Sequence, residues 1–321
     1  MNPLEFLTDH TYRMVFLGTA VIGLVAGALG SFAYLRKQSL ISDVISHAAL
    51  PGALLAFLLV GVVLGGDGRS MLWLIIGAVV IGTLAVLLAN GIARTSKIRI
   101  DTAMAISLTV FFGAGMLLMR YISNSAFPEK GGIQDYLFGN ASVITVADLV
   151  TSIAVGACAL LLMLVFWKEF ALRTFDPDHA RVLGFRGRTI DTLMFTTIVI
   201  ATVIGVKAVG LVLMVAFVVT PPAAARQWTR TLPAMVVLSA IFGAVGSGAG
   251  AYLSIAIGDV PTGPLIVLTL FAILLISLVA SPRRSVVTRS LARARARAAL
   301  KRELLAERPT ARPSANEGVT R

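Results

Sequence analysis

Residues 40–63 read LISDVISHAALPGALLAFLLVGVV, an almost unbroken apolar run. A helix crosses the roughly 30 Å hydrocarbon core of a bilayer with about 20 such residues, so this stretch is long enough to span a membrane. Asp43 and His47 are its ionisable side chains, and Pro51-Gly52 follows them as an expected kink or break of the helix. The run therefore predicts a transmembrane helix with two polar groups close to a distortion of its backbone.

The composition extends this prediction to most of the chain. Of the 321 residues, 57% are hydrophobic and 14% are charged, whereas soluble domains carry about 25% charged residues. The single cysteine, Cys158, excludes a disulfide scaffold and a cysteine-built metal cluster. The dipeptide Gly-Lys is absent, which excludes a Gly-x-x-x-x-Gly-Lys-Ser/Thr phosphate loop. We therefore expect a polytopic membrane protein that is not an enzyme and that needs a partner chain to use ATP.

Apolar stretches of spanning length recur along the sequence. They are expected at 14–34, 40–63, 70–93, 102–122, 143–167, 232–256 and 262–280. The stretch 189–225 is too long for one helix and is interrupted around Lys207, so we expect it to cross twice and to bring the total to nine. If one of its two pieces is re-entrant, eight crossings remain. The prediction is an all-α bundle of eight or nine transmembrane helices over residues 1–281, followed by a tail over residues 282–321.

Basic residues set the expected orientation. The tail over 282–321 contains ten Arg and one Lys against three Glu, a balance of +8 within a net charge of +12. Basic residues also follow the expected first, third and fifth spans, and the positive-inside rule places all of these segments in the cytoplasm. The N-terminus is then outside and the C-terminus inside. We expect the tail to be a cytoplasmic anchor that contacts membrane lipid, with no nucleic acid as a partner.

Asp43 and His47 form the main candidate site. They are four residues apart and so lie on one face of a helix. A carboxylate oxygen beside an imidazole nitrogen is half of a divalent metal site, and two copies of the chain would supply four ligands. Without a thiolate, such a site favours Mn²⁺, Zn²⁺ or Fe²⁺ over Cu⁺. The alternative is structural, with Asp43 pairing with a basic residue or capping a helix.

Lys207 is the other charge inside an apolar stretch. One interpretation is that it caps the turn between two short helices and extends its ammonium group outward. The other is that it lines an outer gate. An ammonium group is not a metal ligand, so Lys207 is not expected to bind the metal directly.

Residues 175–184 read FDPDHARVLG and predict a short amphipathic helix on the cytoplasmic face. Asp176 suits the N-cap, and Pro177 suits the first helical position. Gly184 suits the residue that ends the helix. Such a helix is either a solvated connector or a docking element that inserts into a groove on a motor subunit.

Several separate segments share the pattern of one family. Residues 42–52 resemble the Asp-x-x-Ser-His-Ala-x-Leu-Pro-Gly signature of the manganese/zinc/iron ABC-importer permeases, the ABC-3 family. Other elements of that family are similar to residues 137–140 (LFGN), 175–184, 206–224 and 259–263. Together these segments extend over about 14–281. The tail matches no motif of the family.

The resemblance implies the type II ABC-importer permease fold and a homodimeric or heterodimeric permease core in the bacterial plasma membrane. Its partners would be cytoplasmic ATP-binding-cassette ATPase subunits and an extracytoplasmic metal-binding protein. Asp43 and His47 would be ligands of the transported metal, and no cofactor would be bound permanently. The residues implied to couple the permease to the ATPase are Phe175, Asp176, Ala180 and Gly184.

The expected function is therefore import of a divalent metal ion by alternating access. The alternative is a gradient-driven secondary transporter in which Asp43 and His47 relay protons or cations. That alternative predicts transport by this chain alone in liposomes and gives the helix at 175–184 no role. One oxygen and one nitrogen ligand per chain fit Mn²⁺, Zn²⁺ and Fe²⁺ alike, so the sequence does not select the metal.

Overall fold

The computed structural model describes residues 10–36, 40–66, 68, 70–125, 145–210, 214–258, 260–281 and 297. Within these ranges every regular element is a helix. The elements are α2 (His10–Leu35), α3 (Leu40–Phe57), η1 (Leu58–Val63), α4 (Met71–Thr95), α5 (Ile100–Asn124), α7 (Val146–Val165), α8 (Trp167–Phe175), α9 (Pro177–Val182), α10 (Gly187–Val209), α11 (Met214–Trp228), α12 (Leu232–Ile257) and α13 (Thr262–Ala280). The family-like element at 137–140, residue 259 and the tail from 282, except Arg297, lie outside the described residues.

Eight helices in the described part of the chain are long and apolar enough to cross a membrane. They are α2, α3 with its continuation η1, α4, α5, α7, α10, α12 and α13. The prediction of an all-α polytopic bundle is therefore confirmed, with eight full-length candidate spans.

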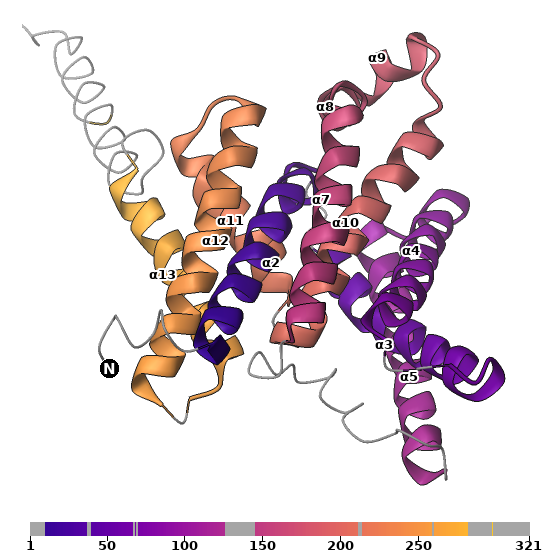
Figure 1. Ribbon diagram of the computed structural model, residues 1–321. Coiled ribbons are helices and arrows are strands. Elements are labelled where there is room, and N and C mark those ends of the chain that lie inside the picture. Colours follow the sequence, from indigo (N-terminus) through magenta and orange to yellow (C-terminus); the bar gives the residue numbers. More distant parts are fainter. Residues whose placement is uncertain are drawn as a thin grey trace, which may run out of the picture.

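The stretch 189–225 decides between the two expected totals, nine crossings or eight. The chain leaves α10 at Val209 and starts α11 at Met214, close to the predicted turn. However, α11 has only 15 residues, about 22 Å of helix, which is shorter than the roughly 30 Å hydrocarbon core. The stretch thus supplies one full-length span and one short helix. Figure 1 shows α13 ending at the end of the bundle that carries α9, and α2 starting at the opposite end.

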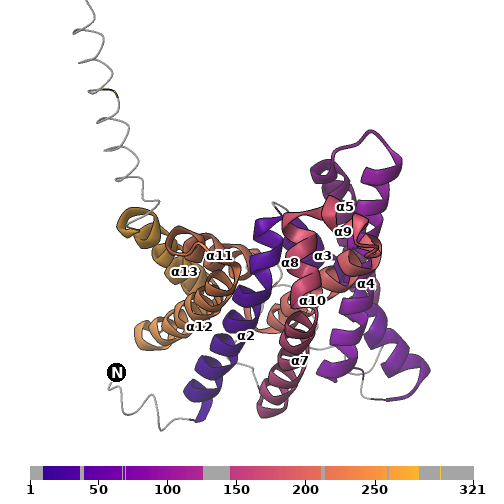
Figure 2. The same cartoon turned by 90° about the horizontal axis from the view of Figure 1, so that it is seen from above.

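The bundle is arranged around α2. Viewed from above, α11, α12 and α13 lie on one side of α2, and α3, α4 and α5 lie on the other, with α7, α8 and α10 alongside (Figure 2). Helix α2 packs directly against α7, α10, α11 and α12. Its buried face includes Leu29 and Phe32, which are 1% exposed.

Small residues let α2 and α12 approach closely. Gly23 and Gly27 are four residues apart on α2, as are Ser239 and Gly243 on α12. The Ser239 hydroxyl donates a hydrogen bond of 2.6 Å to the Gly27 carbonyl, and a Cβ atom on Gly243 would collide with the Gly23 carbonyl. Lipid tails are as apolar as side chains, so close backbone packing of this kind is what holds helices together in a membrane.

The same type of contact positions α3. A Cβ atom on Gly52 would collide with the Gly77 carbonyl of α4, and one on Gly115 of α5 would lie 2.9 Å from Pro51. Helix α3 continues through Pro51 to Phe57 and then widens into the π-helix η1. The expected break at Pro51-Gly52 is therefore absent, because close packing on both sides supports the helix. Proline has no N–H group, so the His47 carbonyl still loses its helical hydrogen bond.

We predict that Gly243→Ala lowers the free energy of unfolding by about 1–3 kcal/mol, because the added methyl group has no space against α2. Gly113→Ala is the matched control, since Gly113 lies in α5 with no atom within 4 Å of an added Cβ. The measurement is the thermal unfolding midpoint of each purified variant in detergent. Equal midpoints for the two variants would contradict the packing described for α2 and α12.

Candidate functional site

The two predicted metal ligands lie side by side on the first turns of α3. The His47 Nε2 atom is 3.3 Å from Asp43 Oδ1, and the two side chains are 16% and 32% exposed. Their neighbours Val44, Ile45 and Ser46 are completely buried. The pair therefore occupies the accessible edge of an otherwise buried helix.

Within the described ranges of the chain, one nitrogen of His47 has no hydrogen-bond partner. The Nδ1 atom is buried without a hydrogen bond, and the ring packs edge-on against Phe112 of α5 with 4.7 Å between centroids. An imidazole offers two nitrogens, so this arrangement leaves one ligating atom unused. A buried polar atom without a partner costs free energy, which is the pattern expected of a site that is completed by something else.

Asp43 and His47 have no further candidate metal ligands beside them in the described part of the chain. No group of three or more His, Cys, Asp or Glu side chains that could hold a metal ion occurs among the described residues. The structural alternative from the sequence was that Asp43 pairs with a basic residue or caps a helix, and Asp43 does lie in the first turn of α3. Among the described basic residues, Arg36 is closest to α3 in the sequence. It binds Asp191, with 2.7 Å between Nη1 and Oδ1.

The predicted helix at 175–184 is present as α9, and its two ends have the expected caps. The Asp176 carboxylate accepts a hydrogen bond of 2.9 Å from the His179 backbone N–H, and Pro177 is the first helical residue. At the other end, Gly184 has φ +81°. The Gly184 and Phe185 N–H groups donate to the Arg181 and Ala180 carbonyls at 3.0 and 3.1 Å. This pair of bonds is the Schellman motif, which glycine permits.

Exposed apolar side chains lie at the end of α9, beside an exposed ion pair between Asp178 and Arg181. Ala180 faces inward and is 1% exposed, whereas Val182 is 84% and Leu183 is 56% exposed. Phe175 and Phe185, on either side of α9, are also exposed. Figure 1 shows α9 at one tip of the bundle. Clustered apolar side chains at such a position mark an interaction surface.

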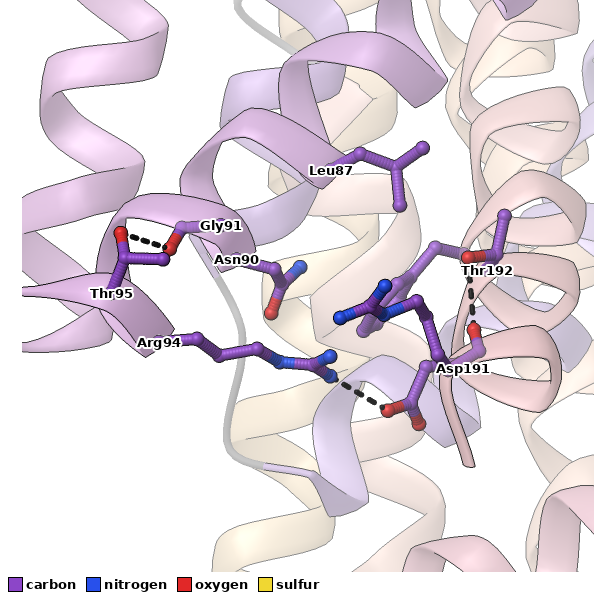
Figure 3. Close-up of a pocket in the computed structure, with 9 residues that line it drawn as sticks. Leu87, Asn90, Gly91, Arg94, Thr95, Asp191 and Thr192 are labelled. Atoms are coloured by element: carbon purple, nitrogen blue, oxygen red, sulfur yellow. Dashed lines mark hydrogen bonds and ion pairs between the residues drawn. The ribbon is translucent and has the colours of Figure 1, made fainter. Parts of the chain in front are cut away.

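A second feature, a buried charge cluster, was not predicted from the sequence. The Asp191 carboxylate at the start of α10 accepts two hydrogen bonds from Arg173 of α8, at 2.8 and 3.0 Å. It also accepts bonds from Arg36, which directly follows α2, and from Arg94 of α4, at 2.7 and 3.3 Å. Figure 3 shows the Arg94 guanidinium reaching Asp191 across the space between α4 and α10. The hydrogen bond to Asp191 raises the pKa of Arg173 above its ordinary value.

This cluster connects α9 to the helix that carries Asp43 and His47. Arg173 lies on α8, which leads into α9, and its side chain also donates to the Pro177 carbonyl at 3.4 Å. Arg36 follows the end of α2, four residues before α3 begins. The available signal in the sequence was Asp191 itself, an acidic residue inside an apolar stretch.

Lys207, the predicted gate, lies in the last turn of α10, just before Gly210. Gly210 has φ +88° and ends the helix. Its N–H donates to the Val206 carbonyl at 2.8 Å. The gate role stays a prediction.

These features describe a multi-span helical protein with an exposed helix at one tip and an Asp43 and His47 pair on the accessible edge of α3. The model of the ABC 3 transport family matches residues 8–281. The chain therefore belongs to the ABC 3 transport family. As the sequence predicted, it is a permease subunit of an ABC transporter and not an enzyme, and the ATPase is a separate chain.

Similar proteins cover nearly the whole membrane domain. The zinc transport system membrane protein TroC of Treponema pallidum is 40% identical over 284 residues, which are 88% of this chain and 93% of TroC. The manganese transport system membrane protein MntC of Bacillus subtilis is 38% identical over 91% of this chain and 66% of MntC. The solved structure of PsaBC from Streptococcus pneumoniae in complex with Fab is 33% identical, covers 87% of this chain and 95% of the solved chain, and has a TM-score of 0.75.

We predict that Asp191→Asn lowers the free energy of unfolding by about 3–5 kcal/mol, because it leaves three arginines without their shared counter-charge. Asp101→Asn is the control, since the Asp101 side chain is 54% exposed and lies 3.9 Å from Arg99. An exposed pair of that kind contributes about 0–1 kcal/mol. Thermal unfolding of both purified variants measures the difference, and similar midpoints would contradict a structural role for the cluster.

Proposed function

We propose that this chain is the permease subunit of an ABC importer that moves a divalent metal ion, Mn²⁺, Zn²⁺ or Fe²⁺, into the cytoplasm. The observation that carries the proposal is the Asp43 and His47 pair with its unpaired imidazole nitrogen. A carboxylate oxygen and a neutral imidazole nitrogen suit these ions. The names of two relatives, a zinc and a manganese transport system membrane protein, support a metal as the substrate.

The metal would bind transiently between two permease protomers. Each chain supplies two ligands, and a second copy or a related permease chain supplies two more. A site divided between protomers is complete only when they are suitably aligned, so a rearrangement of the dimer loosens the ion. Because Pro51 removes a hydrogen bond from the His47 carbonyl, the helical turn that carries the ligands is also less constrained.

ATP hydrolysis in the partner subunits would reach the metal pair through α9. The exposed side chains of Val182 and Leu183 form the apolar contact with the ATPase, and Asp176, Ala180 and Gly184 fix the shape of the helix. Movement of α9 is transmitted to Arg173 and Asp191, and from Asp191 to Arg36 before α3. Each step in this connection is a direct bond or a short chain segment.

The orientation follows from the same arrangement. The end of the bundle that carries α9 is cytoplasmic, the N-terminus is outside and the C-terminus is inside. A metal-binding protein delivers the ion at the opposite end, where Lys207 near the end of α10 borders the entrance. In this proposed orientation the basic tail from 282 is on the cytoplasmic side.

We predict that His47→Ala or Asp43→Ala lowers metal uptake by at least about tenfold, because the half-site loses one of its ligands. The measurement is accumulation of Mn, Zn and Fe by mass spectrometry in cells depleted of native importers. These cells express the chain with its ATPase and its metal-binding protein. His10→Ala is the matched control, because His10 is exposed at the start of α2.

Two outcomes would contradict this assignment. Uptake at the wild-type rate by well-inserted His47→Ala protein would remove the ligand role. Transport by the purified chain alone in liposomes, without an ATPase, would instead support a gradient-driven secondary transporter.

We predict that the double substitution Val182→Ser and Leu183→Ser greatly reduces co-purification with the ATPase, because it removes the apolar docking surface of α9. Ile257→Ser is the control, since Ile257 is 63% exposed and lies at the end of α12 remote from α9. The amount of ATPase that is retained with the tagged permease measures the effect. Full retention and normal turnover in the double variant would show that α9 is not the docking element.

A further inference from the structure

A pocket opens between α4 and α10 beside the charge cluster. Its volume is about 340 Å³, within the usual size of small-molecule sites. Arg94, Asn90 and Thr95 line it from α4, and Arg188, Asp191 and Thr192 line it from α10. Figure 3 shows side chains of both helices around this space. Asn90, Thr95 and Thr192 already donate to backbone carbonyls of their own helices, so the charged donors around the one carboxylate are Arg94 and Arg188.

The cluster beside the pocket has more positive than negative charge. Three guanidinium groups, those of Arg36, Arg94 and Arg173, share the carboxylate of Asp191, so the ion pairs among the described residues set three positive charges against one negative charge. Arg188 adds a fourth positive charge and makes no ion pair within the described part of the chain. The pocket therefore suits an anion, and arginine binds phosphate with particular strength.

Arg94 is the member of the cluster that is free to bind such an anion. Its side chain is 47% exposed, and its bond to Asp191 at 3.3 Å is the longest of the bonds to that carboxylate. A guanidinium group has five N–H donors, and Asp191 uses one of those on Arg94. The carboxylate does not block an anion, because its oxygens already accept bonds from all three arginines.

An apolar track leads from the middle of α4 to this pocket. Val80, Leu84 and Leu87 are spaced by four and three residues, so they lie on one face of the helix. They are 59%, 52% and 38% exposed, and Leu87 also lines the pocket. Arg94 is in the last turn of α4, so the polar mouth lies at the edge of the membrane and the track runs into it.

We propose that this pocket binds the phosphate of an anionic phospholipid, with one acyl chain along Val80, Leu84 and Leu87. A polar, cationic mouth joined to an exposed apolar track has the two-part chemistry of a lipid. Basic pockets between transmembrane helices bind acidic lipid headgroups in this way. An acidic side chain of the ATPase would pair with the arginines but would make no contact with the apolar track.

The test measures thermal unfolding of the purified full-length protein in detergent, together with lipid retention by native mass spectrometry. Phosphatidylglycerol should raise the unfolding midpoint of the wild type by roughly 5 °C, whereas phosphatidylcholine should not. Inorganic phosphate is the third addition, and a midpoint shift equal to that of phosphatidylglycerol would assign the site to free phosphate and overturn the lipid proposal.

Arg188→Gln and Arg94→Gln should each lose at least half of the shift produced by phosphatidylglycerol. Arg188→Gln is decisive, because it leaves the bonds to Asp191 intact and so preserves the fold. Arg99→Gln is the matched control, since the Arg99 side chain is 87% exposed just beyond α4 and its nearest carboxylate, that of Asp101, is 3.9 Å away. All three variants keep the basic tail, so binding of lipid to the tail does not affect the comparison.

Two results would overturn the proposal. An equal shift in Arg188→Gln, Arg99→Gln and the wild type would show that the lipid acts elsewhere. An unchanged lipid shift in Arg188→Gln together with lost co-purification of the ATPase would assign the pocket to a contact with the protein partner. Neither result depends on whether the chain transports metal.

Discussion

The Asp191 carboxylate is the interaction on which the arrangement of helix ends depends. It is buried, and it binds the guanidinium groups of Arg94 in α4, Arg173 in α8 and Arg36, which directly follows α2. A buried charge without partners is strongly unfavourable, so Asp191 keeps these arginines near it. The cluster therefore fixes the relative positions of the ends of α2, α4, α8 and α10. The same group connects α9, the proposed docking helix, to the segment before α3.

Close glycine contacts complete the packing inside the bundle. The Gly23 and Gly243 contact joins α2 to α12, and the Gly52 and Gly77 contact joins α3 to α4. In lipid, burial of apolar side chains contributes little to helix association, so backbone contact and interhelical hydrogen bonds have a larger share. This explains why a proline is tolerated within α3. Helices on both sides of Pro51 hold the chain in place where one backbone hydrogen bond is missing.

The proposed metal site is incomplete within one chain, which suits a transporter. A chain that bound its ion with four ligands of its own would hold the ion tightly, whereas the proposal gives this chain only two, Asp43 and His47. Under the proposal, release depends on how two protomers are aligned, and an ATPase can change that alignment. Because the chain belongs to the ABC 3 transport family, its ATPase is a separate chain. The proposed lipid site lies on the same charge cluster, so membrane composition would act on the connection between α9 and α3.

The sequence by itself determined the features that depend on neighbouring residues. Hydropathy and length gave the spans, spacing placed Asp43 and His47 on one face, and Asp176 and Gly184 marked the ends of α9. Tertiary structure alone decided the continuity of α3 through Pro51, the short length of α11 and the partners of Asp191. Arg36 and Asp191 are 155 residues apart in sequence and 2.7 Å apart in space. Such a pair is brought together by the packing of the whole bundle. Spans and caps depend on residues within a few helical turns of one another, so local sequence patterns predict them but do not predict this pair.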